Sequence, residues 1–130
     1  MLRPLTGWLP DDPVTAAAVQ RWLSIAPARF ATVPAMARGA LQWNMPGDPV
    51  LTVEIAGRLL GFMEQHLSDR NWPAASHITL ADLACYSYVA HAPEGGIPLD
   101  PYPCVRRWLA TVEAQPWFKP MPASPLPSVA

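Results

Sequence analysis

The chain has 130 residues, of which 51% are hydrophobic, and this is the size and composition of one folded domain rather than of a disordered segment. Its formal net charge is −1, with no basic stripe of the kind that nucleic-acid binding requires. Residues Met1 to Pro13 contain no continuous apolar stretch, so we expect neither a signal peptide nor a membrane span, and we expect a cytoplasmic location.

The first helix is predicted to begin at Asp12-Pro13, because aspartate caps free backbone N–H groups and proline suits the first helical position. Apolar residues then recur every three or four positions, as expected for one buried helical face. Pro27 and Pro34 interrupt this pattern, and we expect a kink near each. The helical pattern continues to about Ala40, and residues 42–47 are predicted to form a loop.

A second Asp-Pro pair, Asp48-Pro49, predicts the start of a helix that ends near Leu67. Two apolar stripes run along it. The first stripe contains Leu51, Ile55, Leu59 and Phe62, and the second contains Val53, Ala56, Leu60, Met63 and Leu67. Because a helix that is apolar on two faces is typically buried on both, we predict that this helix is central.

Thr79 and Asp82 have the spacing of a capping box, in which each side chain binds the other residue's backbone N–H. We therefore interpret both as structural residues at the start of a helix that runs to about Ala90. The last helix is expected between Tyr102 and Gln115. No segment shows the alternation of a strand, so the predicted fold is an all-α, compact bundle of about four to five helices.

Two strings in this order, ITLADLA at 78–84 and PYPCVRRWL at 101–109, resemble the C-terminal domain of cytosolic glutathione transferases, the GST superfamily. In that family the Thr-x-x-Asp box starts a helix buried in the centre of the domain. The resemblance implies three parts: a remnant of an interdomain linker at 1–12, a GST C-terminal-like helical domain at 13–118 and a proline-rich tail at 119–130.

The resemblance also implies a function. In the family, a thioredoxin-like N-terminal domain binds glutathione and activates it, while the helical domain supplies the pocket for an apolar, electrophilic second substrate. We find no counterpart of that N-terminal domain here, so we expect no catalytic residue in this chain and no activity of the chain alone. No cofactor is expected, and glutathione would be a co-substrate only if a thioredoxin-like domain is supplied. The alternative function is a stand-alone helical module for protein–protein interaction or dimerisation.

The pocket for the second substrate lies, by the same resemblance, against the first helix of the domain. The resemblance therefore nominates as substrate-binding residues Phe30, Thr32, Val33, Met36 and Arg38. The residues themselves leave a simpler alternative open, namely an ordinary core stripe with one solvated arginine. Of Tyr86 and Tyr88, which point to opposite sides of one helix, we expect one in the core and the other near the pocket.

Metal binding is not predicted. His66, His77 and His91 are not spaced at three or four residues as in a zinc-binding helix, and we interpret them as surface or capping residues. Cys85 and Cys104 have no CxxC spacing and are expected to be small buried residues in a reducing compartment.

Partner binding is predicted from Trp8, which lies in the expected linker. A domain that normally packs against a second domain should expose an apolar patch when it stands alone, and such patches mark interaction sites. We therefore expect self-association, or contact with a thioredoxin-like domain, through the face near Trp8 and the first helix. A small apolar ligand is the other expected partner.

Overall fold

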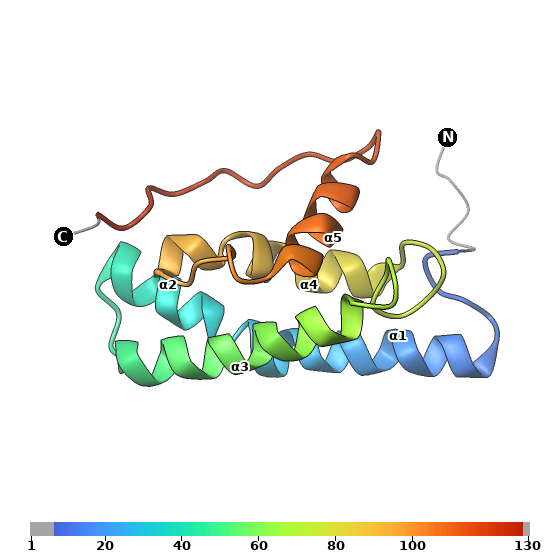
Figure 1. The fold of residues 1–130 in the computed structure, drawn as a ribbon, viewed down its shortest axis with the longest axis horizontal. Helices are drawn as coiled ribbons and strands as arrows, with labels where there is room; N and C mark the ends of the chain where they lie inside the picture. Colours follow the sequence, from blue (N-terminus) through green and yellow to red (C-terminus); the bar gives the residue numbers. More distant parts are fainter. Residues whose placement is uncertain (1–6, 129–130) are drawn as a thin grey trace.

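A computed structural model describes residues 7–128 of the chain (Figure 1). Its elements are, in order, α1 (Pro13–Ile25), the π-helix η1 (Ala26–Phe30), α2 (Pro34–Trp43), α3 (Pro49–Leu67), α4 (Leu80–Ala90), the 3₁₀-helix η2 (Ala92–Gly95) and α5 (Pro103–Glu113). Within residues 7–128 there is no β-strand, which confirms the predicted all-α class. In the same range no helix combines the length and apolar character needed to cross a membrane. Residues 1–6 of the predicted linker and residues 129–130 of the predicted tail lie outside the described range.

Both Asp-Pro pairs begin helices as predicted. The carboxylate of Asp12 accepts the N–H of Thr15 at 2.9 Å, and the carboxylate of Asp48 accepts the N–H groups of Val50 and Leu51 at 3.0 and 3.1 Å. These bonds satisfy donors that the first turn of a helix leaves free.

The two interior prolines act differently from each other. Pro27 lies inside η1, where the wider helix closes with a bond from Ala31 N–H to Ala26 C=O at 2.8 Å. Pro34 is the first residue of α2, which follows a turn at 31–33. The regular α-helical pattern is therefore interrupted at both prolines, by the wider turn at Pro27 and by the new helix start at Pro34.

The predicted end of α2 near Ala40 was wrong, because the helix continues to Trp43. Asn44 ends it in the left-handed conformation, with φ of 52°, a position that asparagine tolerates better than most residues. The last turn is also held from outside, since the Gln42 side chain donates to the carbonyl of Glu94 at 3.1 Å. This long-range bond had no signal in the local sequence.

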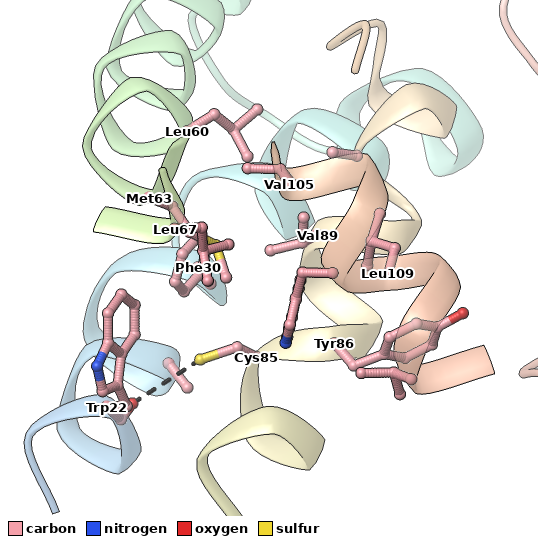
Figure 2. Packing of buried hydrophobic residues seen from close by; sticks show 14 of the residues in the cluster. Trp22, Phe30, Leu60, Met63, Leu67, Cys85, Tyr86, Val89, Val105 and Leu109 are labelled. Carbon is pink, nitrogen blue, oxygen red and sulfur yellow. Dashed lines mark hydrogen bonds between the residues drawn. The ribbon is translucent and has the colours of Figure 1, made fainter. Parts of the chain in front are cut away.

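The core gathers large side chains from α1, η1, α3, α4 and α5 (Figure 2). Among the fully buried residues are Trp22 of α1, Phe30 of η1, Leu60 and Met63 of α3, Val89 of α4 and Trp108 of α5. Helix α4 is lined by small residues and contacts α1, α2, α5 and both short helices, so it occupies the centre of the bundle. Small side chains allow close approach of several helices at once.

The prediction that the helix 49–67 is packed on both sides was wrong. Its second stripe is buried, except for Val53, and packs toward α5 and α2, whereas in the first stripe Leu51 is 51% exposed and Phe62 is 41% exposed. Because α4 already fills the centre, α3 lies at the edge of the bundle. One of its apolar faces is left without a covering helix from residues 7–128.

The predicted capping box is confirmed, and it does more than start α4. Asp82 accepts the backbone N–H of Thr79 at 2.8 Å with one oxygen and the indole N–H of Trp108 at 2.8 Å with the other. Both Thr79 and Asp82 are fully buried. The box therefore also joins α4 to α5, which gives a capping residue a role in tertiary packing.

Candidate functional site

A cavity of about 380 Å³ lies between α2 and α4, and its size is in the range of small-molecule sites. Helix α2 contributes Pro34, Ala35 and Arg38, and α4 contributes Leu83, Ala84, Ser87 and Tyr88. His91 follows α4, and Met121 comes from the C-terminal tail. Since Ala35, Ala84 and Ser87 are small, they leave space between two helices that would otherwise be closely packed.

The close approach of α2 and η2 fixes one end of this cavity. A Cβ atom on Gly95 would lie 2.6 Å from the backbone nitrogen of Arg38 and 2.9 Å from the carbonyl carbon of Ala37. No other residue type fits this position without moving the two backbones apart. Gly95 therefore allows η2 to touch α2, and this contact places Glu94 beside Arg38.

Glu94 is the centre of a buried polar cluster and is only 4% exposed. Its carboxylate forms an ion pair with Arg38, and it accepts bonds from His91 Nδ1 and from the backbone N–H of Ser124, both at 2.8 Å. Burial alone would raise the pKa of Glu94, but the bonds from His91, Ser124 and Arg38 outweigh it and hold that pKa below its usual value. The carboxylate thus remains charged beside the cavity.

Arg38 brings a positive charge to the cavity edge in a fixed orientation. Besides Glu94 it binds the hydroxyl of Ser124 at 2.8 Å, and its guanidinium lies 4.9 Å from the ring centre of Trp43. Such a held arginine, beside the polar groups of Ser87, Tyr88 and His91, can orient a ligand whose body is apolar.

The cysteine of α4 lies in the core and does not line the cavity. Cys85 is fully buried in the core next to Trp22, and burial followed by the nearby Asp82 charge raises its pKa to about 12 (Figure 2). A thiol with that pKa is not a nucleophile at neutral pH. Within residues 7–128, no three His, Cys, Asp or Glu side chains are grouped so that they could hold a metal ion.

The structure separates the five residues that the resemblance nominated. Arg38 lines the cavity between α2 and α4, whereas Phe30 is fully buried in the core. Thr32 is exposed, and its hydroxyl donates to the carbonyl of Ala28 at 2.8 Å. Val33 lines an open groove between η1 and α3, and Met36 lines a small cavity between α2 and α3. The π-helix and the turn at 31–33 interrupt the regular 3.6-residue period. Residues spaced by three or four positions across them therefore do not lie on the same face.

The residues that were not predicted come mainly from α4. Leu83, Ser87 and His91 follow one another at intervals of four, which is the spacing of one helical face, and this periodicity was the available signal. The expectation for the tyrosines agrees with their positions. Tyr88 lines the cavity, and Tyr86 is buried with its hydroxyl donating to Glu113 at 2.8 Å. Burial and this bond raise the pKa of Tyr86.

Residues near the predicted linker are tied to the bundle. Trp8 is half-buried and packs edge-to-face on Trp117 at 5.3 Å between ring centres, and its carbonyl accepts the N–H of Leu80. His77 bonds to the carbonyl of Gly7 at 2.8 Å. Trp8 thus contributes less open apolar surface than the sequence led us to expect.

Comparisons with known proteins agree with this architecture. A glutathione S-transferase crystal structure from Pseudomonas fluorescens superposes with a TM-score of 0.82 at 26% identity, over 87% of this chain and 59% of that one. A second glutathione S-transferase crystal structure, from Xanthobacter autotrophicus, superposes with a TM-score of 0.79 at 28% identity, over 88% of this chain and 58% of that one. Glutathione S-transferase D7 of Anopheles gambiae is 42% identical over 50 residues, which are 38% of this chain and 23% of the relative.

The chain spans less than two thirds of the length of these relatives. The family model described as the glutathione S-transferase C-terminal domain matches residues 52–116, which is half of the chain. This segment contains α4, with its capping box, and all of α5. The chain therefore belongs to the glutathione S-transferase family through its C-terminal, all-helical domain.

Proposed function

We propose that this chain is the ligand-binding helical domain of a glutathione-transferase-type protein, and that it binds the apolar, electrophilic second substrate in the cavity between α2 and α4. The chain supplies no catalytic group of its own. Glutathione and its activation come from a thioredoxin-like domain. The expected site residues are Arg38, Ser87, Tyr88 and His91, with Leu83 and Met121 forming apolar walls.

The observation that carries this proposal is the combination of an apolar cavity with a few converging polar groups at one edge. Arg38 is held by Glu94, so it offers its remaining N–H groups without having to be ordered when a ligand binds. Small side chains on both helices leave the volume open. An ordinary core contact between α2 and α4 would instead be filled by larger side chains.

A direct test is titration of the chain with anilinonaphthalene sulfonate, an apolar fluorescent anion. We expect saturable binding that Ser87→Trp abolishes, because the indole would fill the cavity. Ser76→Trp, in the exposed loop before α4, is the matched control and should bind like the wild type. Equal binding by all three proteins, with unchanged circular dichroism, would contradict the assignment of this cavity.

The division of labour between domains has its own test. We expect the chain alone not to be retained on immobilised glutathione, since the family's glutathione site belongs to the other domain. Conjugation of glutathione to an electrophile is expected only after a thioredoxin-like domain is added or fused. Retention of the chain alone, competed by free glutathione, would show that the helical domain has a glutathione site.

A second candidate function, self-association, is favoured by the exposed apolar face of α3. Ile55, Leu59 and Phe62 form an open groove with Ile25 and Val33. Arg29 and Arg58 line the same groove. This face is better suited to a second copy of the chain than the predicted face near Trp8, because Trp8 already packs on Trp117.

Sedimentation velocity at increasing protein concentration tests this candidate. We expect a dimer that Leu59→Arg weakens, because a third positive charge would enter the groove beside Arg29 and Arg58. Val14→Arg, on the exposed side of α1, is the control, since Val14 is 82% exposed. Loss of the dimer in Val14→Arg alone would favour the face near Trp8 and the first helix. A monomer at all concentrations would argue against both faces.

A further inference from the structure

The C-terminal tail, residues 119–128, does not project away from the bundle. It runs back along the helices from α5 toward α2 (Figure 1). Four of its ten residues are prolines, which restrict the backbone and lower the entropy lost when an extended segment becomes ordered. The tail is therefore suited to bind to the bundle as an extended, non-helical segment.

Three side chains of α2 and η2 bind this tail mainly through its backbone. Glu94 accepts the N–H of Ser124 at 2.8 Å, and Gln42 donates to the carbonyl of Pro125 at 2.6 Å. Arg38 adds a bond to the Ser124 hydroxyl at 2.8 Å. Two of the three tail groups belong to the backbone, so the α2–η2 face recognises an extended segment at one fixed register.

The same cluster borders the cavity between α2 and α4. Arg38 and His91 line the cavity and hold Glu94, while Met121, three residues before Ser124, contributes to the cavity wall. Met121 is 39% exposed and Leu126 is 68% exposed, so the tail buries little apolar surface. Its docking depends on a few hydrogen bonds, and a segment held in this way opens more easily than the helices do.

We infer that the α2–η2 face is a docking site for residues 119–128 and that the docked tail is a gate, with Met121 closing one side of the apolar cavity. When the tail detaches at Ser124, Met121 moves away and the cavity opens to ligand. The gate has a role only if the cavity binds a ligand, so it rests on the proposed function. The docking of the tail does not depend on that function.

The test uses the full chain and the variant Ser124→Pro. Proline removes the N–H that binds Glu94 and the hydroxyl that binds Arg38, in a segment that is already rich in proline. Ala123→Pro is the matched control. Ala123 is exposed, and among residues 7–128 the structure records no hydrogen bond from its N–H. Backbone amide NMR relaxation reports tail order, and dye titration reports cavity access.

We expect residues 121–126 to be as ordered as α4 in the wild type and in Ala123→Pro, and mobile in Ser124→Pro. The dye should bind Ser124→Pro at least about tenfold more tightly, since the open state, a small minority in the wild type, no longer has to be selected from the closed majority. A tail that is equally mobile in all three proteins would overturn the docking site. A released tail with unchanged dye affinity would overturn the gate.

The gate and the proposed function fail in different ways. If no protein binds the dye but Ser124→Pro still releases the tail, the ligand function is contradicted and the docking site is supported. If the dye binds tightly to every variant with the tail ordered throughout, the cavity is supported and the gate is overturned.

Discussion

Two buried carboxylates, Asp82 and Glu94, each join different elements of this molecule. The charges of the groups around them differ. Asp82 joins α4 to α5 in the core, where its partners, Trp108 and Thr79, are neutral donors. Glu94 joins η2 to α2 and the tail, where Arg38 is a cation and the His91 side chain is a second partner. Burial raises the pKa of Asp82 despite its hydrogen bonds, whereas the partners of Glu94 hold its pKa below the usual value.

The two carboxylates also differ in what the loss of a partner would cost. Removing a partner at Asp82 leaves buried polar groups with no access to water, which is costly. At Glu94 the partners lie near the surface, and the Arg38 side chain is 19% exposed, so water can replace a lost bond. The capping box thus belongs to the buried core, whereas the Glu94 cluster lies at the edge of the candidate site, where water can reach Arg38.

The largest expected effect comes from removing the ring that Asp82 holds. Trp108→Ala deletes a fully buried side chain and should lower the free energy of unfolding by about 3–5 kcal/mol. Urea denaturation followed by circular dichroism measures this. Trp117→Ala is the control, because Trp117 is partly exposed and packs on Trp8 at the edge of the bundle, and it should cost about 1 kcal/mol or less. If both variants lost the same free energy of unfolding, Trp108 would not stabilise the fold more than Trp117 does.

Asp82→Ala is expected to destabilise the chain by about 2–3 kcal/mol, since the indole N–H of Trp108 and the N–H of Thr79 both lose their acceptor. The sequence alone predicts a smaller loss, about 1–2 kcal/mol, because it reveals the cap but not the tryptophan. Thermal melting of Asp82→Ala and of Asp69→Ala, an exposed control, measures the difference. A melting temperature unchanged by Asp82→Ala would refute the structural role of the capping box.

Gly95→Ala tests the close contact that positions Glu94. The added methyl would lie 2.6 Å from the backbone of Arg38, so α2 and η2 must separate, at a cost of about 1–3 kcal/mol. Gly61→Ala is a control of opposite sign. A Cβ there meets nothing within 4 Å, and it should stabilise α3 by about 0.5–1 kcal/mol. If Gly95→Ala were neutral in denaturation, the contact would not be as tight as the structure indicates.

The smallest expected effect is local and appears in acid. Because the folded pKa of Glu94 is lowered, its contribution to stability is present above its usual value of 4.5 and is lost as the pH falls through the folded pKa. The contribution of Asp82 to stability depends on pH in the opposite direction. Its raised pKa gives a contribution that is complete below 3.8 and is lost as the pH rises through the folded pKa.

Amide relaxation between neutral pH and pH values below 4.5 measures this contrast. We expect the tail to become mobile in acid before α4 and α5 open. In Glu94→Gln the tail should be mobile at every pH, so its acid dependence should disappear. Simultaneous loosening of the tail and of α4 in acid would show that the two regions do not act independently.

The sequence predicted the elements well where a signal is local. Asp12-Pro13 and Asp48-Pro49 begin helices, and Thr79 with Asp82 forms the capping box, because each of these patterns acts within one turn. The family followed from α4 and α5, where such local patterns are dense. Of the five residues that the resemblance nominated, Arg38 lines the cavity between α2 and α4 and the other four lie elsewhere.

The amino-acid sequence by itself thus determined the all-α class, the helix starts and the family, since caps, prolines and apolar periodicity are properties of neighbouring residues. Tertiary structure decided which face of α3 is covered, where the cavity lies and where the tail is bound. Helix α3 has two apolar stripes, but α4 occupies the centre because its small residues let several helices approach. Glu94 meets Arg38 and Ser124 across 56 and 30 residues of chain, and contacts of that range depend on how the helices pack.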